Sequence, residues 1–386
     1  MGKVNFKKQV IGELVNDIPP VALNAFSAIG DINNDGYIDF VLSGRSGRMV
    51  WFENPGIIGE WKEHFISDVE MIECGGRIFD VNGDGCQDIV CAGDWRNNEV
   101  YWFRNPGDKK SQWDRFLIAK SSLPKFHDVS FGDITGDGVV SIVFTNQRKR
   151  EGTTIFRIPI PSNPCEEPWP SLEIIASGKT EANIAEEGLC IADIDGDGIN
   201  ELICGTSWYK YDNKTKLWKS YKYAKDYVTT KIAVGDIDND GKTEIILSEG
   251  DSSIFGRNKG SKIAWFKQKS NVEEMWEENL IDEGLLDVHS LQIGDILKNS
   301  YMDIFAGEIG VADIETREYI KRPPCLFVYE NDGKGNFKKH IIDEGTGTHD
   351  AFLVDLRNKG VLDIIGKPLH GKERWKIHVW YNQMYL

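Results

Sequence analysis

The stretch DIDGDGINELICG, residues 193–205, carries the pattern that decides the fold. Aspartates alternate at its start, glycines separate them, and an apolar run follows. Seven copies of the frame occur, spaced 43 to 60 residues apart: DINNDGYID from Asp31, DVNGDGCQD from Asp80, DITGDGVVS from Asp133, DIDGDGINE from Asp193, DIDNDGKTE from Asp236, DILKNSYMD from Asp295 and DLRNKGVLD from Asp355. Such recurrence at a near-constant period is the signature of a repeat protein.

Every copy lies in the same surroundings. A short apolar run precedes it (AFSAIG, HSLQIG), and a second follows it (FVLSG, IVCAG, IILSEG). An aromatic segment comes next (MVWFENPG, VYWFRNPG), and a segment such as WKEHFI or WDRFLI ends the repeat. These are strand-forming residues between Gly, Asn and Pro, and no comparable amphipathic helix occurs. Four short strands in each of seven repeats predict an all-β, seven-bladed β-propeller with four-stranded blades, forming a single domain over residues 1–386.

The two ends of the chain predict how the propeller closes. Residues 5–11 read NFKKQVI and resemble residues 336–342, NFKKHII, which form the fourth strand of a repeat. The chain ends on KIHVWYN, residues 376–382, a third strand with no fourth strand after it. We therefore expect the N-terminal strand to complete the last blade, which leaves no open sheet edge between the terminal repeats.

Composition narrows the class of protein. The formal charge of −16 over 386 residues repels phosphate backbones, so a nucleic-acid partner is not expected. The sequence contains no run of eighteen apolar residues, the length that a membrane-spanning helix needs. The start, MGKVNFKKQV, lacks the apolar segment of a secretory signal. The seven cysteines form no Cys-x-x-Cys pair, and several lie within apolar runs, which is typical of buried thiols. These features favour a cytoplasmic protein, although an extracytoplasmic location is possible if a signal was removed.

The aspartate-rich loops predict structural calcium. Oxygen side chains at alternate positions and an acid at the ninth position can surround a cation that takes six to eight oxygens. An EF-hand would place its closing Glu at the twelfth position between helices, so that class is excluded. The candidate ligands are Asp31, Asn33, Asp35, Asp39, Asp80, Asn82, Asp84, Asp88, Asp133, Thr135, Asp137, Asp193, Asp195, Asp197, Glu201, Asp236, Asp238, Asp240 and Glu244. The alternative is an Asx-type turn without metal, which is favoured in the last two copies because Leu297, Arg357 and Lys359 interrupt them.

The repeats resemble the FG-GAP or VCBS family over nearly the whole chain. The resemblance implies a β-propeller with calcium in loops at the blade edges. In that family the calcium is structural rather than catalytic.

A column of histidines predicts a second site. In FHDVSFGDITGDG, residues 126–138, His127 lies six residues before Asp133, which is roughly 20 Å along a strand. The equivalent positions hold Ala25, Cys74, His127, Glu187, Thr230, His289 and His349. If these strands line the propeller axis, the column forms a ring at one channel mouth, opposite the calcium loops. The returning second strands add Arg45, Asp94, Trp95, Asn146, Gln147, Tyr209, Glu249, Glu308 and Lys367, followed by His370.

The column supports two kinds of chemistry. His127, His289 and His349 with Glu187 form a common ligand set for a divalent transition metal, and Mg²⁺ is a further possibility. The same residues also form a plausible acid–base set. The alternative is structural, with the histidines capping strand starts.

A polar mouth with Trp and Tyr side chains suits a sugar or an oligosaccharide. The repeat frame and the histidine column are similar to the propeller of the aldos-2-ulose dehydratase family and to the propeller polysaccharide lyases. This resemblance implies β-elimination on a sugar. A metal, Arg45 or Lys367 would stabilise the enolate, and His127 or His349 would take the proton. If the histidines hold a metal, the base would be Glu187, Glu308, His370 or Tyr209.

Two other classes of function stay open. A non-catalytic carbohydrate- or protein-binding module, like the integrin head propeller, would present a flat variable face instead of histidines in register. A glycosidase needs two facing carboxylates, which Glu187 with Glu308 or Glu249 could supply. The sequence predicts neither the sugar nor the oligomeric state.

Overall fold

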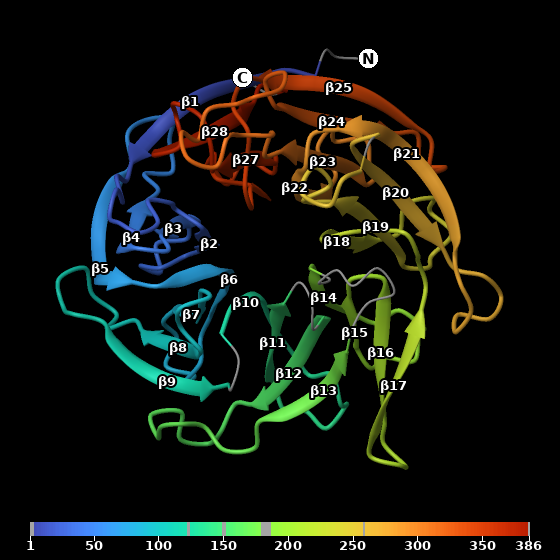
Figure 1. The fold of residues 1–386 in the computed structure, drawn as a ribbon, viewed down its shortest axis with the longest axis horizontal. Coiled ribbons are helices and arrows are strands. Elements are labelled where there is room, and N and C mark those ends of the chain that lie inside the picture. The colour runs from blue at the N-terminus through green and yellow to red at the C-terminus, as the bar shows by residue number, and fades with distance from the viewer. Residues whose placement is uncertain (1–3, 122–123, 149–151, 179–186, 258, 385–386) are drawn as a thin grey trace. The chain divides into compact units, whose positions relative to one another are not determined.

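The computed structural model describes residues 4–121, 124–148, 152–178, 187–257 and 259–384 (Figure 1). Across these residues it contains strands, turns and bends, and no helix. The strands form seven four-stranded sheets, one for each repeat. The predicted fold class, an all-β, seven-bladed propeller with four-stranded blades, is therefore confirmed.

The first three blades follow the chain order. Their strands are β2 (Phe26–Gly30), β3 (Asp39–Ser43), β4 (Gly47–Glu53) and β5 (Lys62–Glu70), then β6 (Ile72–Phe79), β7 (Asp88–Gly93), β8 (Glu99–Arg104) and β9 (Asp114–Lys120), then β10 (Phe126–Gly132), β11 (Ser141–Arg148), β12 (Gly152–Pro159) and β13 (Glu173–Gly178).

The remaining four blades are built in the same way. Their strands are β14 (Leu189–Ala192), β15 (Glu201–Cys204), β16 (Ser207–Asp212) and β17 (Leu217–Lys222); β18 (Thr230–Gly235), β19 (Glu244–Glu249), β20 (Ser261–Lys267) and β21 (Glu277–Leu285); β22 (Val288–Gly294), β23 (Asp303–Glu308), β24 (Cys325–Asn331) and β25 (Phe337–Glu344); and β26 (Phe352–Val354), β27 (Asp363–Gly366) and β28 (Lys376–Asn382), with β1 (Phe6–Glu13) as the fourth strand.

The chain divides into two compact units. The N-terminal unit comprises residues 14–191 and 210–218, and the C-terminal unit comprises residues 1–13, 192–209 and 219–386. Within the N-terminal unit, β2 packs against β6 and β6 packs against β10. Within the C-terminal unit, β18 packs against β22 and β22 packs against β26. In each unit, therefore, the first strands of consecutive blades are neighbours. A single domain over residues 1–386 stays a prediction.

The N-terminal strand joins the last blade. β1 pairs antiparallel with β28, and Phe6 lies opposite Asn382 while Val10 lies opposite His378. Both strands belong to the C-terminal unit. The predicted pairing of NFKKQVI with KIHVWYN is confirmed, and the backbone groups along that side of β28 are used within the blade instead of forming an exposed edge.

The burial of each strand depends on its position in the blade. The second strands β3, β7 and β19 are buried at every residue, which explains the apolar runs at their centres. The fourth strands β21 and β25 mix exposed and half-buried residues. Blade-to-blade packing forms the cores: Phe126, Phe144 and Trp102 lie in one cluster of the N-terminal unit, and Trp265 and Phe327 lie in one cluster of the C-terminal unit.

An amide at the end of the third strand fastens one blade to the previous one. Asn331, the last residue of β24, donates from Nδ2 to the carbonyl of Ile237 at 2.8 Å, in the loop of the preceding blade. Asn105, Asn382, Asn213 and Gln268 make the same kind of contact, with Ile32 at 2.8 Å, Ile296 at 3.0 Å, Thr135 at 2.9 Å and Ile194 at 2.7 Å. We call this contact the inter-blade clasp. It gives Asn105, in the NPG segment after β8, a physical role.

The described part of the chain contains no helix of the length and apolarity that a membrane crossing requires. All seven cysteines are free thiols, and Cys74, Cys91, Cys204 and Cys325 are buried. The expectation of buried thiols is confirmed at these four positions. The cytoplasmic location stays a prediction.

Candidate functional site

The first aspartate of each loop closes the turn with hydrogen bonds. Asp193 Oδ1 accepts from the backbone N–H of Gly196 at 2.7 Å, and Oδ2 accepts from Gly198 at 2.9 Å. Gly198 has a φ of 86°, a left-handed conformation that a side chain would strain. The interrupted copy that begins at Asp355 also closes in this way, since Asp355 Oδ1 accepts from the N–H of Lys359 at 3.0 Å. The Asx turn therefore forms in copies with and without the full acidic set.

The ninth-position aspartates tie each loop to its third strand. Asp39 accepts from the N–H of Ile32 at 3.0 Å with one oxygen and from that of Asn54 at 2.8 Å with the other. Asp88 and Asp303 make the equivalent pairs of bonds. Burial raises the pKa of Asp39 to about 7, against the opposing effect of these N–H groups. This structural role accounts for both oxygens of the carboxylate, so these loops fit calcium less well than the spacing predicted.

The loops that end in Glu differ. Glu244 Oε2 accepts from the N–H of Ile237 at 2.8 Å, whereas Oε1 is buried and has no hydrogen-bond partner among the described residues. Asp238 Oδ1 is in the same situation. One oxygen each from Asp236, Asp238 and Glu244 lie within 4.8 Å of one another. Burial, with the nearby loop carboxylates, raises the pKa of Glu244 to about 7. This set fits a hard cation.

The charge of Lys267 affects this first loop, and the loop of the preceding repeat offers a second acidic set. The ammonium group of Lys267 contacts Asp238 and lies 2.9 Å from Asp240 Oδ2, so it supplies one positive charge to the loop. In the preceding repeat, oxygens of Asp193, Asp195 and Asp197 also lie within 4.8 Å of one another. These two loops are therefore the copies in which the geometry best matches the predicted calcium ligands.

A histidine pair lies in the C-terminal unit. His289, on β22, and His349, just before β26, stack with ring centroids 5.1 Å apart and an interplanar angle of 24°. Ser290 Oγ and Thr348 Oγ1 lie 2.9 Å apart and join the two segments next to the rings. Gly250 leaves the space for His289, because a Cβ there would lie 3.3 Å from its Cε1.

Charged groups surround this pair. His349 Nδ1 lies 2.9 Å from Asp350 Oδ2 and 3.4 Å from the ammonium group of Lys367, and Lys231 Nζ lies 3.4 Å from Asp350 Oδ1. Burial lowers the pKa of His349 well below its usual value; Asp350 opposes the shift, and Lys367 and His289 add to it. His349 is therefore neutral at neutral pH. Burial would raise the pKa of Asp350, but His349, Lys231 and Lys367 hold it well below its usual value.

We call His289, His349, Asp350, Lys231 and Lys367, together with Asp251 and His370, the histidine–lysine cluster. His289 Nε2 lies 3.5 Å from Asp251 Oδ1, and its buried Nδ1 has no hydrogen-bond partner among the described residues. Burial, together with Arg317, His289 and Lys367, lowers the pKa of His370 to about 4. The cluster thus places the buried ammonium group of Lys367 beside the neutral imidazole of His349, an arrangement seen where a charge or a proton is handled.

Two predicted catalytic residues have extensive ionic contacts of their own. Glu308 accepts from Arg322 at 2.7 Å on each oxygen, and from the N–H groups of Leu286 and Cys325 at 2.8 Å. Arg45 Nε donates to Glu73 at 2.9 Å. These contacts fit structural roles, and the base role of Glu308 and the electrophile role of Arg45 stay predictions. Tyr209 lies on β16, opposite Leu202 of β15, and its predicted base role also stays a prediction.

His127 belongs to a separate set of contacts, in the N-terminal unit. Its Nε2 lies 3.1 Å from the Cys74 thiol and 3.4 Å from Glu187 Oε2, and its Nδ1 lies 3.2 Å from Asp128. Gln147 contacts the Glu187 carboxylate. Burial would lower the pKa of His127, but Cys74, Glu187 and Asp128 raise it well above the usual value.

The histidine column is thus divided between the two units. His289 and His349 come together, while His127 is described only with its own unit. A metal shared by all three histidines stays a prediction. Sequence reasoning missed Lys231, Asp350 and Asp251 and treated Cys74 as a buried apolar residue. The HD pairs at 127–128 and 349–350 were the available signal for the orienting carboxylates.

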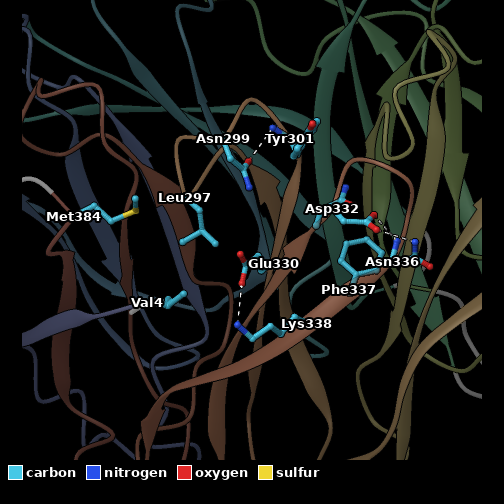
Figure 2. A pocket seen from close by; sticks show the side chains of 11 residues that line it. Val4, Leu297, Asn299, Tyr301, Glu330, Asp332, Asn336, Phe337, Lys338 and Met384 are labelled. Atoms are coloured by element: carbon cyan, nitrogen blue, oxygen red, sulfur yellow. Dashed lines mark hydrogen bonds and ion pairs between the residues drawn. The ribbon is translucent and has the colours of Figure 1, made fainter. Parts of the chain in front are cut away.

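A pocket of about 640 Å³ lies elsewhere in the C-terminal unit (Figure 2). Figure 2 shows Val4, Leu297, Phe337 and Met384 lining it, with Glu330 among them. In the interrupted copy that begins at Asp295, Leu297 replaces a loop oxygen and contributes apolar surface instead. The sequence did not predict this pocket.

Comparison with known proteins agrees with this architecture. Residues 80–144 and 193–247 match the family model described as FG-GAP-like repeat. Over 399 residues the chain is 22% identical to the T-cell immunomodulatory protein homolog of Plasmodium falciparum (isolate 3D7), an alignment that covers 90% of this chain and 51% of that protein. The chain thus spans about half the length of this curated relative.

Solved structures show the same fold at low identity. YCF48 from Cyanidioschyzon merolae gives a TM-score of 0.54 at 10% identity, covering 98% of this chain and 99% of that one. BBS1N, in a complex with ARL6DN, gives 0.56 at 7% identity, covering 99% and 98%. The V. cholerae biofilm matrix protein Bap1 gives 0.50 at 10% identity, covering 99% and 92%. The chain carries FG-GAP-like repeats in a seven-bladed β-propeller.

Proposed function

We propose that the histidine–lysine cluster binds an acidic sugar and removes a proton from it, as the first step of a β-elimination. The observation that carries this proposal is the neutral His349 imidazole beside the ammonium group of Lys367, which is 1% exposed. Ammonium groups in a buried site create a potential that favours an anionic ligand. A neutral imidazole next to them can act as a base at physiological pH.

The chemistry follows from the contacts of each group. Lys367 and Lys231 bind the sugar carboxylate and stabilise the charge that develops on it when the adjacent C–H bond breaks. Asp350 accepts the Nδ1–H of His349 (2.9 Å) in the neutral tautomer, so the Nε2 lone pair takes the proton. The electrons of the C–H bond form a C=C bond, and the C–O bond at the β position breaks. The departing oxygen then takes a proton, which gives an unsaturated sugar and an alcohol.

The test is an incubation of the protein with uronate-containing oligosaccharides. The expected product absorbs in the ultraviolet because its new double bond is conjugated to the carboxylate. His349→Ala should abolish turnover and retain binding, whereas Lys367→Met should weaken binding at least about tenfold, the effect of losing one buried charge contact. His340→Ala is the matched control, because His340 lies on the fourth strand β25, outside the cluster, where it pairs with Glu330. Turnover that survives in His349→Ala would contradict the assignment.

A second candidate is a non-catalytic binding module. It is favoured by the name of the Plasmodium falciparum relative, a T-cell immunomodulatory protein homolog, which refers to no reaction. Calorimetry with the same oligosaccharides separates the two functions. Binding that depends on Lys367 with no unsaturated product supports the module, and binding together with product supports the lyase.

We further propose structural calcium in the loops that close with Glu, at Asp236, Asp238 and Glu244 and at Asp193, Asp195 and Asp197. The buried Glu244 and Asp238 oxygens that lack hydrogen-bond partners support the first of these sites. Metal analysis of the purified protein, before and after chelation, tests both sites. Absence of calcium after dialysis against millimolar calcium would exclude them.

A further inference from the structure

The N-terminal unit contains a cluster of reactive side chains that the proposed elimination does not use. Cys74 lies on β6, and its Sγ is 3.1 Å from Nε2 of His127, on the neighbouring strand β10. A glycine permits this approach, because a Cβ at Gly75 would lie 2.6 Å from the carbonyl oxygen of His127. The two strands therefore hold the thiol and the imidazole within proton-transfer distance.

The imidazole is oriented from its other side. His127 Nδ1 lies 3.2 Å from Asp128 Oδ2. The same oxygen accepts from Thr145 Oγ1 at 3.2 Å and from the N–H of Gly188 at 3.3 Å. A nucleophile, a base and a third group that orients the base form the arrangement that activates cysteines for attack.

Charges of both signs surround the pair, since the Glu187 carboxylate favours the imidazolium of His127 but opposes a thiolate beside it. Arg45 interacts electrostatically with Cys74 and adds a second cation, whose own carboxylate partner is Glu73. Glu187, 3.4 Å from His127 Nε2, stabilises the imidazolium. Cys74 is 7% exposed, so only a small reagent can reach it.

We propose that Cys74 is a nucleophilic thiolate, paired with the His127 imidazolium, that attacks small carbon electrophiles. The Sγ proton moves to Nε2 of His127. The thiolate then attacks the electrophilic carbon, a C–S bond forms, and the leaving group departs with the electron pair of its bond. With iodoacetamide as the probe, the products are a thioether at Cys74 and iodide.

Two measurements on the full chain test this proposal. The ultraviolet absorbance of the thiolate, taken as the difference between wild type and Cys74→Ser, reports ionisation whether or not a reagent can enter. Iodoacetamide labelling, located by peptide mass spectrometry, reports nucleophilicity at each thiol. Cys165 is the internal control, because it is exposed and lies in no such triad. We expect Cys74 to be labelled about tenfold faster than Cys165 at pH 6, where an ordinary thiol is almost fully protonated.

Variants separate positioning from structure. His127→Gln should abolish the thiolate absorbance at pH 6 and slow labelling of Cys74 at least about tenfold, while labelling of Cys165 is unchanged. Asp128→Asn should shift the pH profile of Cys74 labelling upward by a smaller amount. Absence of thiolate absorbance at neutral pH overturns the proposal. A thiolate that iodoacetamide does not label also overturns it, since Cys74 would then be a buried ion-pair partner and not a nucleophile.

Discussion

Replacing Asn331 with Ala tests whether the inter-blade clasp stabilises the propeller. Asn331 is 1% exposed. Its Nδ2 donates to the carbonyls of Ile237 at 2.8 Å and Met302 at 3.0 Å, and its Oδ1 accepts from the N–H of Gly333 at 3.0 Å. The substitution removes these three bonds at once. Each buried group left unpaired costs about 1–3 kcal/mol. Allowing for solvent access to some of these groups, we expect a loss of about 2–4 kcal/mol in the free energy of unfolding.

The assay is equilibrium unfolding in urea, comparing the midpoint and slope of wild type with those of the variant. The midpoint should fall while the slope stays constant, because the native state keeps its surface. Asn336→Ala is the control: its exposed amide donates to Asp332 at 2.9 Å, and its loss should change stability by less than about 0.5 kcal/mol. If Asn331→Ala is no more destabilising than Asn336→Ala, the clasp does not stabilise the fold.

The remaining predictions concern closure, calcium and pH. Deleting residues 1–11 removes most of β1 from β28 and should lower the free energy of unfolding by several kcal/mol, roughly the contribution of two buried apolar side chains. The melting temperature should fall accordingly, and an unchanged melting temperature would refute the closure role. Chelation should lower the melting temperature, and Asp197→Ala should reduce the bound calcium by one ion per chain. Calorimetry should show calcium binding at the Glu244 loop weakening about fivefold from pH 7 to 6, because a carboxyl with a pKa of about 7 must first lose its proton; pH-independent binding would argue against this ligand. Burial lowers the pKa of His378 to about 4, whereas in the unfolded chain the same side chain takes up its proton near pH 6.5. The free energy of unfolding should therefore decrease as the pH falls from 6.5 to 4. His378→Gln should make this decrease smaller, as measured by urea unfolding at the two pH values.

The sequence by itself determined the repeat architecture and its closure. Seven aspartate-rich loops between strand-like runs predict seven four-stranded blades, and the likeness of residues 5–11 to residues 336–342 predicts the pairing of β1 with β28. These features could be predicted because a strand and its turn depend on neighbours a few residues away. The turn at Asp193 is an example, since its hydrogen bonds reach only to Gly198.

Only the tertiary structure decided what the polar residues do. The ninth-position Asp39 has the spacing of a calcium ligand, yet its carboxylate is used by backbone N–H groups, one of them at Asn54 on another segment. Lys231 meets Asp350 across 119 residues, and Cys74 meets His127 across 53 residues. Such pairs depend on which strands pack together and on their register. Residues far apart in the sequence therefore acquire their partners, charges and pKa values only when the blades assemble.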